Sequence, residues 1–202
     1  MPIPTRPNLD LPDALLEYRP HFIVPEDEKR LFDRLLDEIP WQEGKVSLFG
    51  REHPIPRLQA WVGDSGARYR YSGVDLEPVP WTPSLLKILE DLSTIRPDAR
   101  FNSVLANLYR DGNDSMGWHS DDEPELGEEP TIASVSLGAS RDFRMRHRVR
   151  QEVESVTLPL ESGSLLLMEG TTQSHWQHSL PRRTGKNCPG PRINLTFRRI
   201  LF

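Results

Sequence analysis

The chain has 202 residues with 36% apolar and 27% charged side chains, which fits one globular domain and excludes fibrous and disordered classes. No apolar run approaches the roughly 20 residues that span a bilayer, and the single cysteine, Cys188, excludes an intrachain disulfide and favours a reducing, intracellular compartment. The net charge of −5 gives no indication of a general polyanion-binding protein, although basic residues cluster locally, above all between residues 179 and 202.

Helices are expected only in the N-terminal half of the chain. Residues 1–20 indicate an extended, proline-rich leader that lacks the basic and apolar regions of a signal peptide. A helix is predicted over residues 26–39, because apolar side chains fall on one stripe at helical spacing and Pro40 follows. The stripe consists of Leu31, Phe32, Leu35, Leu36 and Ile39. A second helix is predicted over residues 82–93, with Thr82 as its cap and Pro83 in its first position.

The remainder of the chain predicts short strands. Apolar and polar residues alternate in short segments that are bounded by Gly, Pro, Asn or Asp. These segments are residues 45–49, 58–62, 67–72, 101–110, 131–137, 142–149, 153–160, 164–168, 174–179 and 192–200. Many short strands after a helical N-terminal part predict an α+β barrel or jelly roll with helices on one side.

The strand at residues 142–149 carries a basic face. Phe143, Met145, His147 and Val149 share one face, whereas Arg144, Arg146 and Arg148, together with the flanking Arg150, share the other. An exposed row of arginines fits either a solvated surface or a strip that follows phosphates. The sequence leaves both interpretations open.

A metal centre is indicated by GWHSDDE at residues 117–123. His119 and Asp121 are two residues apart, so they point the same way in a strand-like stretch. One imidazole and one carboxylate are two of the three ligands of a 2-His-1-carboxylate triad, which binds iron(II) and leaves positions open. The third ligand would be His175 or His178, and the residues alone do not separate the two.

The segment PRINLTFRR indicates an anchor for a dicarboxylate. Arg192, Asn194, Thr196 and Arg198 share one face of the predicted strand. Each guanidinium can hold a carboxylate through paired hydrogen bonds. In a straight strand the two arginines lie about 20 Å apart, so they reach one small dianion only if the strand curves or their side chains converge.

Taken together, NLYRDGNDSMGWHSDDE, ASVSLGASRDFRMRH, HSLPRR and PRINLTFR resemble the AlkB family of iron(II)- and 2-oxoglutarate-dependent oxidative demethylases. The resemblance runs from about Trp41 to Phe202 and is strongest to the duplex-DNA branch, that of the second human homologue. It implies a single dioxygenase domain over residues 1–202, built as a double-stranded β-helix (jelly roll) with N-terminal helices. A nucleotide-recognition lid would occupy residues 40–75 and the catalytic β-helix residues 100–202.

The resemblance also implies roles for individual residues. His119, Asp121 and His178 would be the catalytic iron ligands, and Arg192 would hold the distal carboxylate of 2-oxoglutarate. Further co-substrate contacts would come from Arg198 at the metal end, Asn107 and Tyr109. Nucleic acid would be contacted by a base wall, an acidic residue facing the base, an apolar wedge and a basic loop. The base wall corresponds to Tyr69, Tyr71 and Ser72, and the acidic residue to Glu123. The wedge corresponds to Leu48 and Phe49, and the basic loop to Arg182, Arg183 and Lys186.

The function implied by the resemblance is oxidative removal of alkyl groups from bases such as 1-methyladenine and 3-methylcytosine in DNA, and so direct DNA repair. The reaction would consume O₂ and 2-oxoglutarate and release succinate, CO₂ and formaldehyde. The expected partner is duplex DNA with a flipped base. The protein is expected to act as a monomer and not to associate with a membrane. That monomer would work in the cytoplasm of a bacterium or the nucleus of a eukaryote.

Besides a small-molecule or protein hydroxylase, which would leave the lid match unexplained, two other interpretations remain. The same chemistry could act on RNA, although an apolar tip at Leu48 and Phe49 favours a duplex-DNA wedge. Alternatively, the chain could be a non-catalytic β-helix module that binds a metal or nucleic acid. An incomplete triad or a missing Arg192 would have supported this second alternative, but all of these residues are present.

Overall fold

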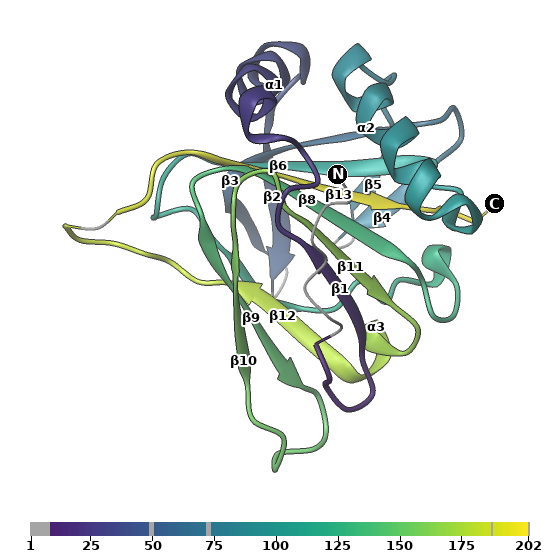
Figure 1. The fold of residues 1–202 in the computed structure, drawn as a ribbon, viewed down its shortest axis with the longest axis vertical. Helices are drawn as coiled ribbons and strands as arrows, with labels where there is room; N and C mark the ends of the chain where they lie inside the picture. The colour runs from purple at the N-terminus through teal and green to yellow at the C-terminus, as the bar shows by residue number, and fades with distance from the viewer. Residues whose placement is uncertain (1–8, 49–50, 72–73, 187, 202) are drawn as a thin grey trace.

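Two antiparallel β-sheets face each other, and the two long helices lie on the outer side of the larger sheet (Figure 1). The computed structural model describes residues 9–48, 51–71, 74–186 and 188–201. Within these residues no helix combines the length and the apolar character needed to cross a bilayer.

The larger sheet has seven strands. In spatial order they are β1 (Leu15–Arg19), β11 (Leu165–Glu169), β8 (Ile132–Gly138), β13 (Arg192–Arg198), β6 (Ser103–Tyr109), β3 (Arg51–Gly63) and β2 (Gln42–Leu48). The smaller sheet has four strands, in the order β10 (Val156–Leu160), β9 (Arg141–His147), β12 (Trp176–Leu180) and β7 (Met116–His119). A separate hairpin is formed by β4 (Tyr69–Tyr71) and β5 (Val74–Leu76).

The eight strands from β6 to β13 form a jelly roll. Along the chain they are divided equally between the sheets, so that β6, β8, β11 and β13 lie in the large sheet and β7, β9, β10 and β12 in the small one. This arrangement confirms the predicted double-stranded β-helix. The strands β2 and β3 extend the large sheet beyond β6.

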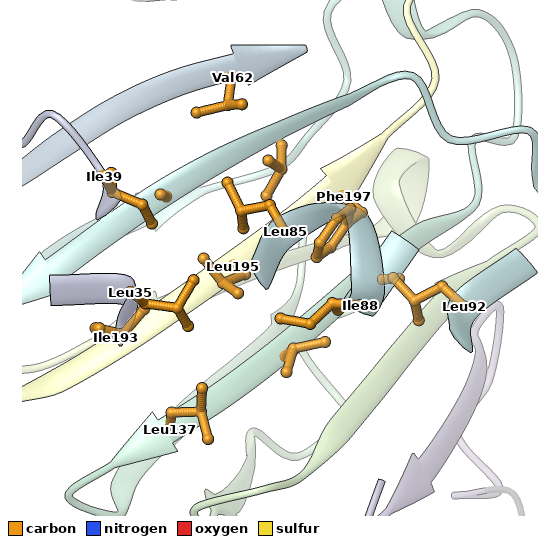
Figure 2. Packing of buried hydrophobic residues seen from close by; sticks show 14 of the residues in the cluster. Leu35, Ile39, Val62, Leu85, Ile88, Leu92, Leu137, Ile193, Leu195 and Phe197 are labelled. Atoms are coloured by element: carbon orange, nitrogen blue, oxygen red, sulfur yellow. The ribbon is translucent and has the colours of Figure 1, made fainter. Parts of the chain in front are cut away.

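The strand β13 is buried on both faces, and this burial positions the site. Ile193, Leu195 and Phe197 point outward to the helices and are fully buried there (Figure 2). The alternate residues, from Arg192 to Arg198, point to the space between the two sheets. A strand that contacts apolar helices on one face can therefore present polar side chains inside the jelly roll on the other.

The helices α1 (Pro25–Glu38) and α2 (Pro83–Ile95) cover the outer face of the large sheet. Leu35 and Ile39 from the predicted stripe are buried there, in the same apolar cluster as Leu85, Ile88 and Leu92 of α2 (Figure 2). The side chain of Thr82 accepts a hydrogen bond from the backbone N–H of Leu85, as expected for an N-cap. Both helices thus follow the predictions to within two residues at each end.

Several sequence predictions need correction. Residues 15–19 of the expected leader form the edge strand β1, which pairs with β11. The predicted strand at 174–179 begins only at Trp176, because residues 172–175 form the short helix α3 (Thr172–His175). Val149 does not share the inner face of β9, since that strand ends at His147 and Val149 is 77% exposed.

Candidate active site

Two histidines and one carboxylate meet between the sheets. His119, Asp121 and His178 each offer one ligand atom, and these atoms all lie within 4.8 Å of one another. Asp121 and His178 are buried, and His119 is half-buried. A cluster of two imidazoles and one carboxylate matches the donor set that holds iron(II) with positions left open.

Strand pairing explains why these three residues meet. In the antiparallel pair β7 and β12, His119 lies directly opposite His178. Their ring centroids are 4.2 Å apart. Asp121 follows His119 by two residues and reaches the same side from the segment after β7. One cross-strand pair therefore assembles a site from segments far apart in the chain.

The hydrogen bonding of His119 leaves a ligand nitrogen available. Its Nδ1 lies 2.9 Å from the carbonyl oxygen of Gly117, and because a carbonyl only accepts, Nδ1 carries the proton. The other ring nitrogen, Nε2, is then unprotonated and can bind a metal. Burial lowers the pKa of His119, which further favours the neutral ring.

The electrostatics of the other two ligands also suit a cation. Burial, with a smaller contribution from neighbouring His119, lowers the pKa of His178 to about 3, so this ring is neutral at physiological pH. Burial alone would raise the pKa of Asp121, but the positive charge of Arg198 and its hydrogen bond to the carboxylate lower the pKa to about 2. A neutral imidazole and an ionised carboxylate are the forms that ligate metals.

His175 lies elsewhere. It sits at the end of α3, where its Nδ1 is 3.1 Å from the carbonyl oxygen of Thr171. Its ring is tilted against that of His147, with 5.8 Å between the centroids. Of the two candidates from the sequence, His178 is therefore the one that joins His119 and Asp121.

Both arginines of β13 line the same cavity as the three candidate ligands, and both are at most 2% exposed. The cavity lies between the two sheets and is partly open to solvent. Arg198 lies at the metal end, where its Nη2 donates to Asp121 Oδ1 at 2.8 Å. Arg192 lies opposite Tyr109 on β6, and Asn194 lies opposite Asn107.

Arg192 fits a bound carboxylate. Its Nη2 donates to Ser136 Oγ at 2.9 Å, whereas its Nε is buried without a hydrogen-bond partner among the described residues. Burial, together with the nearby charge of Arg141, lowers the pKa of Arg192 to about 10, so it stays charged at neutral pH. A buried guanidinium with an N–H group that lacks an acceptor is suited to bind an anion.

The family profile of the 2OG-Fe(II) oxygenase superfamily matches residues 16–198. The chain belongs to this superfamily. The cofactors of the oxygenase are iron(II) and 2-oxoglutarate, and the residues present fit them. The histidine and aspartate donors suit iron(II), and the unfilled donor of Arg192 suits a dicarboxylate.

Relatives of the oxygenase confirm the AlkB resemblance. DNA oxidative demethylase ALKBH2 of Mus musculus is 46% identical over 181 residues, which cover 85% of this chain and 74% of that protein. Alpha-ketoglutarate-dependent dioxygenase alkB homolog 3 of Bos taurus is 41% identical over 189 residues, which cover 90% of this chain and 64% of that protein. The solved structure of OsALKBH1 has a TM-score of 0.63 at 19% identity, covers 91% of this chain and 96% of that chain, and supports the fold.

The predicted nucleic-acid contacts of the oxygenase are only partly within the described structure. Phe49 and Ser72 lie outside the described residues, and for Leu48, Tyr69 and Tyr71 only the backbone is described, in β2 and β4. The wedge and the base wall therefore stay predictions.

The predicted acidic contact is half-buried, whereas the predicted basic contacts are exposed. Glu123 is half-buried, two residues after Asp121. Arg182, Arg183 and Lys186 are exposed on the loop between β12 and β13, and Arg183 forms an ion pair with Asp142. Their contact with nucleic acid also stays a prediction.

The arginine row that runs along β9 and just past its end is exposed as predicted, and two of its members contact neighbouring side chains. Arg146 lies 4.4 Å from the ring centroid of Trp118 and donates two hydrogen bonds to Gln177. Arg148 pairs with Asp122. His147, on the opposite face, packs edge-on against the ring of Trp176, as expected for a structural histidine.

Two residues near the site have contacts that the sequence did not indicate. Phe143 stacks on the ring of His178, with 5.0 Å between the centroids. Arg141 is buried and donates to the carbonyl oxygens of Asp111, Asp114 and Pro181, which joins the loops on both sides of the cavity. Alternation along β9 placed Phe143 inward, but no local signal indicates which side chain it meets.

Proposed function

We propose that this oxygenase removes alkyl groups oxidatively from N-alkylated bases in DNA and so repairs alkylation damage directly. The observation that carries the proposal is the shared cavity, in which His119, Asp121 and His178 lie together with two buried arginines of β13. The substrate class is supported by the relative named DNA oxidative demethylase, with 46% identity over 85% of the chain.

The proposed reaction is balanced by the two co-substrates. When bound, iron and 2-oxoglutarate supply the oxidising power for O₂ chemistry, as cofactors do in general. One oxygen atom of O₂ enters succinate as 2-oxoglutarate loses CO₂, and the other hydroxylates the N-alkyl carbon. For a methylated base, the resulting N-hydroxymethyl group leaves as formaldehyde, and the ring nitrogen regains its normal valence. Substrates of this kind include 1-methyladenine and 3-methylcytosine.

The protein residues hold and orient the reactants. His119, Asp121 and His178 would hold iron(II), and Arg192 would bind the distal carboxylate of 2-oxoglutarate with help from Tyr109. Arg198 would act at the metal end, where it already holds Asp121. Asn107 lines the same cavity, and its Oδ1 accepts a hydrogen bond from Arg57, so its NH₂ group remains available as a donor. Phe143 and Leu180 supply apolar walls that exclude water.

The duplex preference and base flipping belong to this proposal. Tyr69, Tyr71 and Ser72 would form the wall against which the flipped base stacks, and Leu48 and Phe49 would fill the vacated gap. Arg182, Arg183 and Lys186 would contact backbone phosphates. We further propose that the protein works as a monomer and acts where the genome is kept, in the cytoplasm of a bacterium or the nucleus of a eukaryote.

The deciding experiment starts from anaerobic protein loaded with iron(II) and 2-oxoglutarate. O₂ is then admitted with a methylated oligonucleotide, offered in parallel as duplex DNA, single-stranded DNA and RNA. Mass spectrometry follows the loss of the methyl group. We expect loss from duplex DNA with wild type and His175→Ala but not with His178→Ala, because only His178 lies among the candidate ligands.

The other outcomes separate the alternatives. Faster loss from RNA would move the substrate to RNA. Succinate formation with every oligonucleotide unchanged would retain the oxygenase and discard the base substrate. No succinate under any condition would favour a non-catalytic module that binds metal or nucleic acid.

The acidic residue Glu123 tests the proposed lesion class. We expect its carboxylate to offset the positive charge of 1-methyladenine or 3-methylcytosine, because it lies two residues from Asp121. Glu123→Gln should therefore reduce the preference for cationic over neutral alkylated bases, measured as the ratio of kcat/KM values. An unchanged ratio would remove Glu123 from lesion recognition.

A further inference from the structure

We propose that Gln173 is a positioning residue of the metal centre, which holds the backbone of Asp121 through its side-chain amide. The inference rests on the metal centre of the proposed function and adds a residue that none of the sequence motifs indicated. It concerns how the carboxylate ligand is kept in place rather than how substrate is bound.

Asp121 needs such support because of its position. It lies two residues past the end of β7, outside the strand that holds His119. Its backbone N–H donates to Gln173 Oε1 at 2.9 Å. Its carboxylate accepts from Arg198 at 2.8 Å. Side chains from two different elements thus hold the two ends of this residue, and both Asp121 and Gln173 are 1% exposed.

Gln173 connects two ligand-bearing segments. It lies in α3, which leads directly into β12 and so to His178. A second hydrogen bond joins the same segments, since Ser120 Oγ donates to the carbonyl oxygen of Trp176 at 2.9 Å. The two bonds fix the segment of Asp121 to the strand of His178, which sets the relative position of two ligands.

The orientation of the Gln173 amide is determined by its surroundings. Its Nε2 lies 3.5 Å from the sulfur of Met168, a weak acceptor. Turning the amide over would bring its NH₂ group against the N–H of Asp121, so two donors would face each other. The side-chain oxygen of Gln173 therefore faces the backbone N–H of Asp121. Because both residues are buried, water does not readily replace this hydrogen bond.

Four variants test this role by metal affinity. Gln173→Met keeps the length of the side chain but removes the acceptor, and Gln173→Asn stays polar but is one methylene too short. Gln173→Glu retains an acceptor oxygen in either protonation state. Thr172→Val is the matched control, because Thr172 is the adjacent buried residue of α3 and its hydroxyl bonds with Leu15 and Glu169 instead.

The measurements are the Kd for Mn(II) by calorimetry and the Tm of the metal-free protein. Loss of partners beyond the ligands typically weakens metal affinity about 10- to 100-fold, so we expect such a loss in Gln173→Met and Gln173→Asn and a near wild-type Kd in Gln173→Glu. Thr172→Val should lower Tm and leave the Kd unchanged. This pattern would assign positioning rather than general stability to Gln173.

The remaining outcomes overturn the inference in distinguishable ways. Wild-type affinity in Gln173→Met and Gln173→Asn would show that the amide does not support the centre. Affinity that falls in step with Tm in every variant, Thr172→Val included, would reduce Gln173 to a structural residue. Failure of wild type itself to bind Mn(II) would overturn the metal centre, and with it this role.

Discussion

At the scale of single residues, the site is a group of buried charges arranged for ligands that the chain does not itself contain. Asp121 and Arg198 offset each other at 2.8 Å, and both are nearly inaccessible. Arg192 has a hydroxyl partner and a neighbouring aromatic ring, Tyr109, rather than a carboxylate. Burying a charge without a counter-charge is costly, so we expect Arg192 to serve binding rather than stability.

Replacing Arg192 should separate binding from stability. Because hydrogen bonds to charged groups contribute about 1.5 to 3 kcal/mol each, we expect Arg192→Met to weaken 2-oxoglutarate binding about 10- to 100-fold. The metal-free protein should unfold at an equal or higher temperature. Titration of the Mn(II)-loaded protein with 2-oxoglutarate provides the measurement, with the exposed Arg199→Met as control. Equal losses in both variants would contradict a specific anchor.

At the scale of elements, the two loops beside the cavity are fixed to each other. The backbone N–H of Arg183, between β12 and β13, donates to the carbonyl oxygen of Gly112, between β6 and β7, at 2.8 Å. A Cβ on Gly112 would lie 1.9 Å from the carbonyl oxygen of Arg183. Only glycine permits this approach, so the position of the basic loop depends on one residue of the neighbouring loop.

Gly112→Ala should therefore displace the basic loop. We expect a loss of stability of about 1 to 3 kcal/mol from the clash and weaker binding of duplex DNA, while Mn(II) affinity is retained, since the ligands lie on β7, β12 and the segment after β7. Gly190→Ala, in the basic loop itself, is the control, because a Cβ at this position would have no other atom within 4 Å. DNA affinity is measured by fluorescence anisotropy, and equal affinity in the two variants would show that this loop does not contribute to DNA binding.

At the scale of the whole molecule, the jelly roll encloses its ionisable ligands between two sheets. Burial lowers the pKa of both His119 and His178 in the metal-free protein. In the unfolded chain both rings titrate near the ordinary value of 6.5. The unfolded state therefore binds more protons below that pH, and folding stability must fall as the pH falls.

The pH dependence of stability checks this linkage. We expect the free energy of unfolding of the metal-free protein to decrease as the pH is lowered from about 7.5 to 5, through the unfolded-state pKa of the histidines. His178→Asn should show a shallower decrease over this window. Chemical denaturation at each pH supplies the free energies, and parallel curves for the two proteins would contradict a buried neutral His178.

Much of the fold and part of the site follow from local pattern. The stripe from Leu31 to Ile39 and the cap at Thr82 were enough to predict the two long helices, because helical spacing and capping act within a few residues. Alternation along PRINLTFRR correctly placed Arg192 and Arg198 on one face. The same reasoning missed β1 and the short helix α3, since both depend on packing against β11 and the neighbouring segments rather than on a strong local signal.

The sequence by itself determined which residue types stand at which face of each strand, and with the family resemblance it determined the chemistry. Only the tertiary structure decided that His178 lies opposite His119 while His175 lies against His147. It also decided that Arg192 and Arg198, expected about 20 Å apart in a straight strand, open into one cavity. Side-chain alternation is set by the backbone of a single strand, whereas register is set by pairing between distant segments, where a shift of one residue would turn every side chain to the other face.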